Sequence, residues 1–175
     1  MSETLAADDR FSTRNFARLT ELIHSYSGIK MPPSKRTMLA VRLRSRIAAL
    51  DLGDLDGYCR YLFEDGGMDS ELVHLINAVS TNKTDFFREP AHFEFLRDTA
   101  LPELAAAGRR EVKFWSAAAS IGAEAYTMAM VLEEFRTRHH GPDYAILATD
   151  ISTEVLALAV QGQFAEAMVQ PVPSD

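Results

Sequence analysis

A polar segment between two helical patterns carries side chains suited to binding a charged ligand. Residues 80–90 read Ser-Thr-Asn-Lys-Thr-Asp-Phe-Phe-Arg-Glu-Pro. Asparagine and threonine side chains donate and accept hydrogen bonds, and the planar guanidinium of Arg88 matches the shape of a carboxylate. The adjacent Phe86 and Phe87 are suited to anchor the segment on an apolar core. We therefore expect this connector to contribute to a binding site.

A second candidate site lies where a short apolar run gives way to small residues. Residues 112–115 favour a strand, residues 116–122 have little side-chain bulk, and residues 124–135 read as a helix. In a doubly wound sheet, such a turn lies at the carboxyl end of the strand, where cofactors bind. The turn lacks the Gly-x-Gly-x-x-Gly spacing and any Gly-Lys-Ser/Thr, which disfavours pyrophosphate binding. A tight turn packed with alanine, without a ligand, is the alternative.

An acidic residue follows the next strand pattern. The apolar residues 144–148 run into Thr-Asp-Ile-Ser, in which the acid is Asp150. Cofactor domains of the α/β class hold the two hydroxyls of a ribose with an acid at this place. Asp150 is equally suited to be the N-cap of a helix that starts at Thr153. The sequence leaves both roles open.

The elements that must position these residues divide into two groups. Four amphipathic patterns precede the connector, beginning near Thr13, Ser34, Leu55 and Ser70, and Ser34 and Ser70 are the expected N-caps of the second and fourth helices. Together they predict a compact helical domain. After the connector, residues 92–107 read as one helix, and the remaining order is strand, helix, strand, helix.

We predict an α/β fold class with an all-α amino-terminal domain. Residues 1–80 form the helical domain, residues 81–91 the connector, and residues 92–175 the first β-α-β-α part of a Rossmann-like domain. Both strands are apolar runs without alternation, a pattern typical of strands that are buried on both faces. A sheet of only two such strands leaves apolar surface exposed. We therefore expect a homo-oligomer that forms through this incomplete sheet.

Charge is distributed unevenly along the chain. The formal net charge of −7 argues against nucleic-acid binding by the whole chain, but residues 10–46 are strongly basic. Lys35, Arg42 and Arg46 share one side of the second helix. A solvated face is the plain interpretation of these charges, and a docking surface for an acidic partner is the other.

The sequence also bears on the cellular compartment. No apolar run is long enough to span a bilayer, no signal-peptide pattern precedes the first helix, and Cys59 is the single cysteine. We expect a cytoplasmic protein without membrane insertion, in which Cys59 is a small core residue.

Four motifs in order resemble the chemotaxis receptor methyltransferases of the CheR family. They are Lys35-Arg36 with Arg42-Leu43 and Arg46, the connector from Thr81 to Glu89, the turn Trp115-Ser-Ala-Ala-Ala-Ser-x-Gly-x-Glu-x-Tyr, and Ala-Thr-Asp150-Ile. The resemblance covers most of the chain from about residue 11. It implies S-adenosylmethionine as cofactor, S-adenosylhomocysteine as product, and glutamate side chains on cytoplasmic chemoreceptor helices as methyl acceptors. It also implies a Rossmann-like methyltransferase domain after the helical domain, and we expect no metal.

The resemblance assigns roles to individual residues. The cofactor contacts that it implies are Asn82, Thr84, Arg88, Ala118, Glu124 and Asp150. Arg88 is also the catalytic candidate, because a guanidinium can orient a carboxylate of the cofactor or of the acceptor. The acceptor is already ionised at neutral pH, so positioning matters more than a strong base. The substrate-docking residues that the resemblance implies are Lys35, Arg42 and Arg46.

The chain departs from the family pattern in the small-residue turn. Where the family has Ser-Thr-Gly-Glu-Glu-Pro-Tyr-Ser, this chain has Ser-Ile-Gly-Ala-Glu-Ala-Tyr-Thr over residues 120–127. One acid, one hydroxyl and the helix-starting proline are replaced, and family members continue through further strands. The alternative function is therefore a noncatalytic module that binds receptors or another partner through its basic helical domain.

Overall fold

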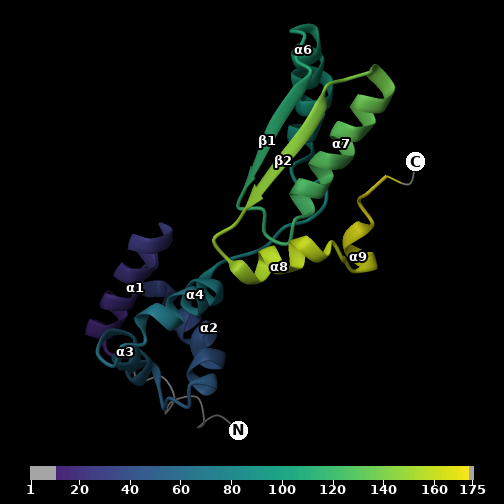
Figure 1. The fold of residues 1–175 in the computed structure, drawn as a ribbon. Coiled ribbons are helices and arrows are strands. Elements are labelled where there is room, and N and C mark those ends of the chain that lie inside the picture. Colours follow the sequence, from purple (N-terminus) through teal and green to yellow (C-terminus); the bar gives the residue numbers. More distant parts are fainter. Residues whose placement is uncertain (1–10, 174–175) are drawn as a thin grey trace. The chain divides into compact units, whose positions relative to one another are not determined.

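A computed structural model describes residues 11–173 of the chain. The described residues fall into two compact units that divide between Ser80 and Thr81 (Figure 1). Each unit has its own apolar core. Within the described range, no helix combines the length and the apolar character that a bilayer crossing needs.

The first unit is helical, as the sequence predicted. Its elements are α1 (Thr13–Ser27), the 3-10 turn η1 (Pro33–Lys35), α2 (Arg36–Ala49), α3 (Leu55–Phe63) and α4 (Met68–Val79). The side chain of Ser12 caps α1 by accepting a 3.2 Å hydrogen bond from the backbone N–H of Asn15. Gly28 ends the helix with φ 73°, a left-handed conformation that glycine adopts without strain.

The starts of α2 and α4 differ from the prediction. Ser34 was expected to cap α2, but it lies inside the 3-10 turn, because the fixed φ of Pro33 suits the first position of a helical turn. Ser70 was expected to cap α4, but this helix begins at Met68 after Gly67. The hydroxyl of Ser70 instead donates to the backbone carbonyl of Gly67 at 3.1 Å.

The core of the first unit is built from one apolar stripe of each helix. Tyr58 and Cys59 of α3 are fully buried there. They pack with buried side chains that include Leu19, Ile23, Leu39, Leu43, Leu55, Leu62 and Leu75. Cys59 is therefore the core residue that the sequence predicted.

The second unit joins helices to a small parallel sheet. Its elements are α5 (Pro90–Phe95), the π-helical segment η2 (Leu96–Ala100), α6 (Leu101–Ala106), β1 (Glu111–Ala117), α7 (Ala123–His139), β2 (Asp143–Thr149), α8 (Thr153–Gln161) and α9 (Glu166–Val169). The region predicted as one helix over residues 92–107 therefore contains a wider turn. Pro102 lacks the N–H that a regular helix would donate to Asp98, which favours an irregular turn just before it.

The two strands pair in parallel, from Glu111 opposite Asp143 to Ala117 opposite Thr149. One face of the sheet packs on helices: Phe114, Tyr144 and Ile146 contact the core that contains Val131, Leu132 and Phe135 of α7. On the other face, Trp115 and Leu147 lie opposite each other in register and are 66% and 61% exposed. The apolar surface that the strand pattern predicted is therefore present on this face.

Candidate functional site

The turn between β1 and α7 has an unusual backbone. Ala118 has φ 63° and Ser120 has φ 52°, a region that residues with a Cβ rarely adopt. Gly122 follows with φ 93°, and a Cβ added there would lie 3.1 Å from the ring of Tyr126 and 3.2 Å from the Cβ of Ala159. The turn therefore requires glycine at this position. Backbone strain of this kind is typical of ligand sites, which supports a functional role for the turn.

Asp150 fixes this turn to the end of β2. Its Oδ2 accepts a 2.8 Å hydrogen bond from the backbone N–H of Ser120, and its Oδ1 accepts one of 2.9 Å from the backbone N–H of Ser152. Ser152, not Asp150, holds the N-cap position of α8. Each carboxylate oxygen can accept a further bond, so the geometry leaves room for a ligand hydroxyl. The ribose role of Asp150 stays a prediction.

Phe86 and Phe87 anchor the connector, as the sequence predicted. Phe86 is 6% exposed and packs edge-on against Phe164, with ring centroids 4.8 Å apart. Phe87 packs in the same manner against Phe93 of α5 at 5.9 Å. The backbone N–H of Phe87 also donates to Oγ1 of Thr127 in α7 at 3.2 Å. The connector is therefore held against α5 and α7.

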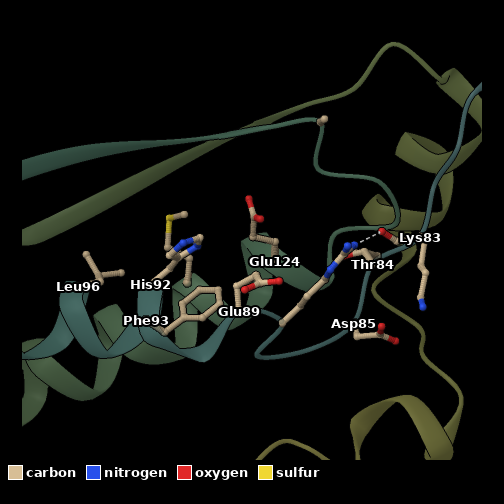
Figure 2. A pocket seen from close by; sticks show the side chains of 11 residues that line it. Lys83, Thr84, Asp85, Glu89, His92, Phe93, Leu96 and Glu124 are labelled. Atoms are coloured by element: carbon tan, nitrogen blue, oxygen red, sulfur yellow. Dashed lines mark hydrogen bonds between the residues drawn. The ribbon is translucent and has the colours of Figure 1, made fainter. Parts of the chain in front are cut away.

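Arg88 lies at the most strained part of the connector. Its neighbours Phe87 and Glu89 have φ values of 52° and 56°. Its Nη1 donates a 2.8 Å hydrogen bond to the backbone carbonyl of Lys83, which closes the connector into a loop (Figure 2). A guanidinium has five N–H donors, so this bond leaves donors for a ligand.

A cavity of about 430 Å³ lies beside this loop. Four of the predicted cofactor residues line it: Thr84, Arg88, Ala118 and Glu124. The other lining residues are Lys83, Asp85, Glu89, His92, Phe93, Leu96 and Met128. The connector, the small-residue turn and the first two turns of α7 therefore meet at one place.

Glu124 is the fixed acid of this cavity. It lies in the first turn of α7, and its Oε1 accepts a 2.7 Å hydrogen bond from Oγ of Ser116. Ser116 belongs to β1 and is 1% exposed. The bond holds the carboxylate toward the end of the strand, where it can accept hydrogen bonds from a ligand ammonium group. A carboxylate is also favoured by the positive amino end of a helix.

Asn82 and Asp150 lie outside the lining of the cavity but contact the turn that forms its wall. The backbone carbonyl of Asn82 accepts a 2.8 Å hydrogen bond from Oγ of Ser120, while Asp150 accepts from the N–H of the same serine. The structure therefore brings four of the six predicted residues into the cavity and joins the other two through Ser120. Direct cofactor contacts by any of the six stay predictions.

Sequence reasoning missed several residues of the site. Ser116 is a buried polar residue that directly follows the aromatic residues Phe114 and Trp115 of β1, which was a usable signal. Met128 follows Glu124 by one helical turn, so a helical reading of α7 places it on the same side. His92 begins the pattern that continues with Phe93 and Leu96. Within residues 11–173, no cluster of histidine, cysteine or carboxylate side chains has the arrangement of a metal site.

Arg46, a predicted docking residue of the first unit, is held by a buried partner. Its Nε and Nη2 each lie 2.8 Å from a carboxylate oxygen of Glu71. Glu71 is 2% exposed and also accepts a 3.0 Å hydrogen bond from the hydroxyl of Tyr58. Burial and the Glu71 carboxylate raise the pKa of Tyr58, so its hydroxyl stays a donor.

The other two predicted docking residues, Arg42 and Lys35, differ from each other in how far they are bound within the first unit. Nη1 of Arg42 donates to the backbone carbonyls of Val79 and Ser80, which end α4. Lys35 is exposed at the end of the 3-10 turn. The three predicted docking residues therefore do not form one uniformly solvated face. Their role in docking stays a prediction.

Comparison with known proteins relates both units to the same family. Residues 14–80 match the family described as CheR methyltransferase, all-alpha domain, and residues 82–175 match the CheR methyltransferase, SAM binding domain. The chemotaxis protein methyltransferase of Escherichia coli (strain K12) is 38% identical over 162 residues, which are 93% of this chain and 53% of that protein.

Two further relatives give the same picture. The chemotaxis protein methyltransferase of Borreliella burgdorferi is 34% identical over 163 residues, 90% of this chain and 57% of that protein. A probable chemotaxis protein methyltransferase of Rhizobium etli is 35% identical over 153 residues, 86% of this chain and 57% of that protein. The chain spans about half the length of the curated relatives that it matches.

Proposed function

Since this chain belongs to the CheR methyltransferase family, we propose that it takes part in S-adenosylmethionine-dependent O-methylation of glutamate side chains on chemoreceptors. The observation that carries the proposal is the cavity at which Thr84, Arg88, Ala118 and Glu124 meet. These residues come from three separate segments of the chain that the fold brings to one cavity. The names of the relatives, chemotaxis protein methyltransferases, support the same activity.

The residues of the cavity fit the chemical groups of this cofactor. S-adenosylmethionine supplies an activated methyl group on a sulfonium, and it carries a ribose, an ammonium and a carboxylate. Glu124, held by Ser116, accepts hydrogen bonds from the ammonium. Asp150 accepts from the ribose hydroxyls while it keeps the turn in place through Ser120. Arg88 binds a carboxylate through the donors that the Lys83 carbonyl leaves available.

Catalysis in this proposal is mainly positioning. The acceptor glutamate is ionised at neutral pH, so no residue needs to remove a proton from it. Arg88 holds the acceptor or cofactor carboxylate in line with the reacting bond, and the strained loop around it fixes the guanidinium in advance. Orientation of reactants accounts for a large part of the rate in such displacements.

The helical unit supplies the docking surface for acidic receptor helices in the cytoplasm. Lys35 makes direct contact because it is exposed. Arg42 and Arg46 contribute positive charge from α2 while they also bind α4. The attraction between a basic helix and acidic helices weakens as salt screens it.

A transfer assay tests this proposal. The chain is incubated with S-adenosylmethionine that carries a radioactive methyl group and with receptor helix fragments that have glutamate or glutamine at the acceptor positions. We expect base-labile label only in the glutamate fragment, with a rate at least about tenfold lower in Arg88→Ala, because a charge-assisted hydrogen bond is lost.

The matched control for this assay is Arg97→Ala, which removes an exposed arginine that is paired with Asp98 and lies outside the cavity. Its rate should equal that of the unchanged chain. Cofactor binding without any transfer would favour the noncatalytic receptor-binding module. The absence of both cofactor binding and methyl transfer would contradict the proposal.

A further inference from the structure

We propose that His92 binds the carboxylate at the amino-acid end of the cofactor. This inference rests on the proposed function and adds a residue outside the four motifs that carry the resemblance. It also separates the roles of two cationic groups: His92 takes the carboxylate of the cofactor, and Arg88 takes that of the methyl acceptor.

The first support is the place of His92 in the cavity. It belongs to α5 and lines the same cavity as Glu124. Figure 2 shows Glu124 between His92 on one side and the connector residues Lys83 and Thr84 on the other. If the ammonium group of a ligand binds Glu124, the imidazole of His92 therefore lies on the side of the ligand away from the connector.

The second support is the supply of donors around Glu124. An amino-acid end needs an acceptor for its ammonium and a donor for its carboxylate, and Lys83, Arg88 and His92 are the basic residues of the lining. Nη1 of Arg88 is directed to the Lys83 carbonyl on the connector side. The side chain of Lys83 points away from Glu124 in Figure 2. His92 is therefore the donor on the α5 side of Glu124.

The third support is the environment of the imidazole. His92 is exposed, so a ligand that enters the cavity can reach its imidazole. A neutral imidazole has one N–H donor and a protonated one has two, so His92 can donate to a carboxylate in either state.

Binding of the cofactor carboxylate by His92 has a consequence for Arg88, because the reaction involves two carboxylates. A methyl transfer to glutamate brings the cofactor carboxylate and the acceptor carboxylate into one site. The cavity offers two donors for them, His92 on α5 and Arg88 in the connector. With His92 on the cofactor, the guanidinium of Arg88 remains for the acceptor, the group whose orientation decides the rate.

Two ligands that differ only at the amino-acid end test the inference. S-adenosylhomocysteine carries the ammonium and carboxylate, whereas 5′-methylthioadenosine keeps the nucleoside and thioether without them. Dissociation constants of both are measured by calorimetry on the unchanged chain, His92→Leu and His92→Arg. We expect His92→Leu to weaken S-adenosylhomocysteine binding about tenfold and to leave 5′-methylthioadenosine unchanged. His92→Arg keeps a donor and should stay within about threefold for both ligands.

The control is His74→Leu, because His74 is an exposed histidine on α4 in the other unit. This substitution should change the dissociation constant of neither ligand. An equal loss of both ligands in His92→Leu, or no loss of either, would overturn the role of His92 while the proposed function stands. If the unchanged chain binds neither ligand, the proposed function fails and this inference fails with it.

Discussion

The guanidinium of Arg46 on α2 and the carboxylate of Glu71 on α4 form two parallel hydrogen bonds, each of 2.8 Å. Glu71 is 2% exposed, and its carboxylate also accepts a hydrogen bond from the hydroxyl of Tyr58. Arg46 was grouped by sequence with the basic surface residues. Part of the positive charge of α2 is therefore used to join two helices of the first unit.

Loss of Arg46 should destabilise the first unit. Arg46→Ala leaves a buried carboxylate without its charged partner, and we expect the free energy of unfolding to fall by about 3 kcal/mol. Arg44→Ala, an exposed neighbour on the same helix, should change it by less than about 0.5 kcal/mol. Urea denaturation followed by circular dichroism measures both. Equal effects of the two substitutions would mean that the pair does not stabilise the unit.

Cys59 should be unreactive in the folded chain. Burial raises the pKa of its thiol to about 12, whereas an unfolded thiol titrates near about 8.5. The protonated thiol therefore makes its full contribution to the free energy of unfolding below about pH 8.5, and this contribution is lost as the pH rises toward about 12. At pH 8, we expect labelling by a thiol reagent to be at least about a hundredfold slower than in denaturant. Labelling at the denatured rate would show that the thiol is accessible.

Lys35 is the clearest test of the docking surface, because reversing Arg42 or Arg46 also removes contacts to α4. We expect Lys35→Glu to weaken binding of acidic receptor helix fragments by about threefold to tenfold at low salt. The difference should shrink as salt is added. Arg109→Glu, an exposed arginine of the second unit, is the control. The two variants are compared by titration with the receptor fragments. An equal loss of affinity in both would mean that binding depends on the net charge of the chain and not on a docking surface at Lys35.

The open face of the sheet should cause self-association. Trp115 and Leu147 are paired in register and largely exposed, and such an apolar surface favours contact with a second copy of the same chain. We expect light scattering across a dilution series to show a dimer that dissociates on dilution. Replacing both residues by glutamine should give a monomer, whereas Phe95→Gln, which removes an aromatic that is 62% exposed on α5, should not. A monomer at every concentration would contradict this expectation.

Local patterns predicted the parts of this fold that depend on nearby residues. The stop of α1 at Gly28 follows from the conformational freedom of glycine, and the turn after β1 was expected because residues 116–122 have little side-chain bulk. The connector was identified as more than a linker because Phe86 and Phe87 interrupt a polar sequence. Both phenylalanines do pack on aromatic side chains.

The parts that were missed depend on residues brought together by packing. The partner of Arg46 lies on another helix, so no spacing within α2 indicates it. The bond from Ser116 to Glu124 joins a strand to a helix across the turn. Phe164 reaches Phe86 only after the chain has passed through both strands. Such contacts require the arrangement of the elements, which periodicity alone does not give.

Calorimetric titration of the chain with S-adenosylhomocysteine tests the central claim most directly, because the claim is that one cavity beside Arg88 and the turn held by Asp150 binds this ligand. We predict binding at a single site, weakened about tenfold in Glu124→Ala and in Asp150→Ala through the loss of hydrogen bonds to the ammonium group and to the paired ribose hydroxyls, and unchanged in Arg97→Ala. An unchanged chain that releases no heat of binding, or equal affinity in all three variants, would contradict it.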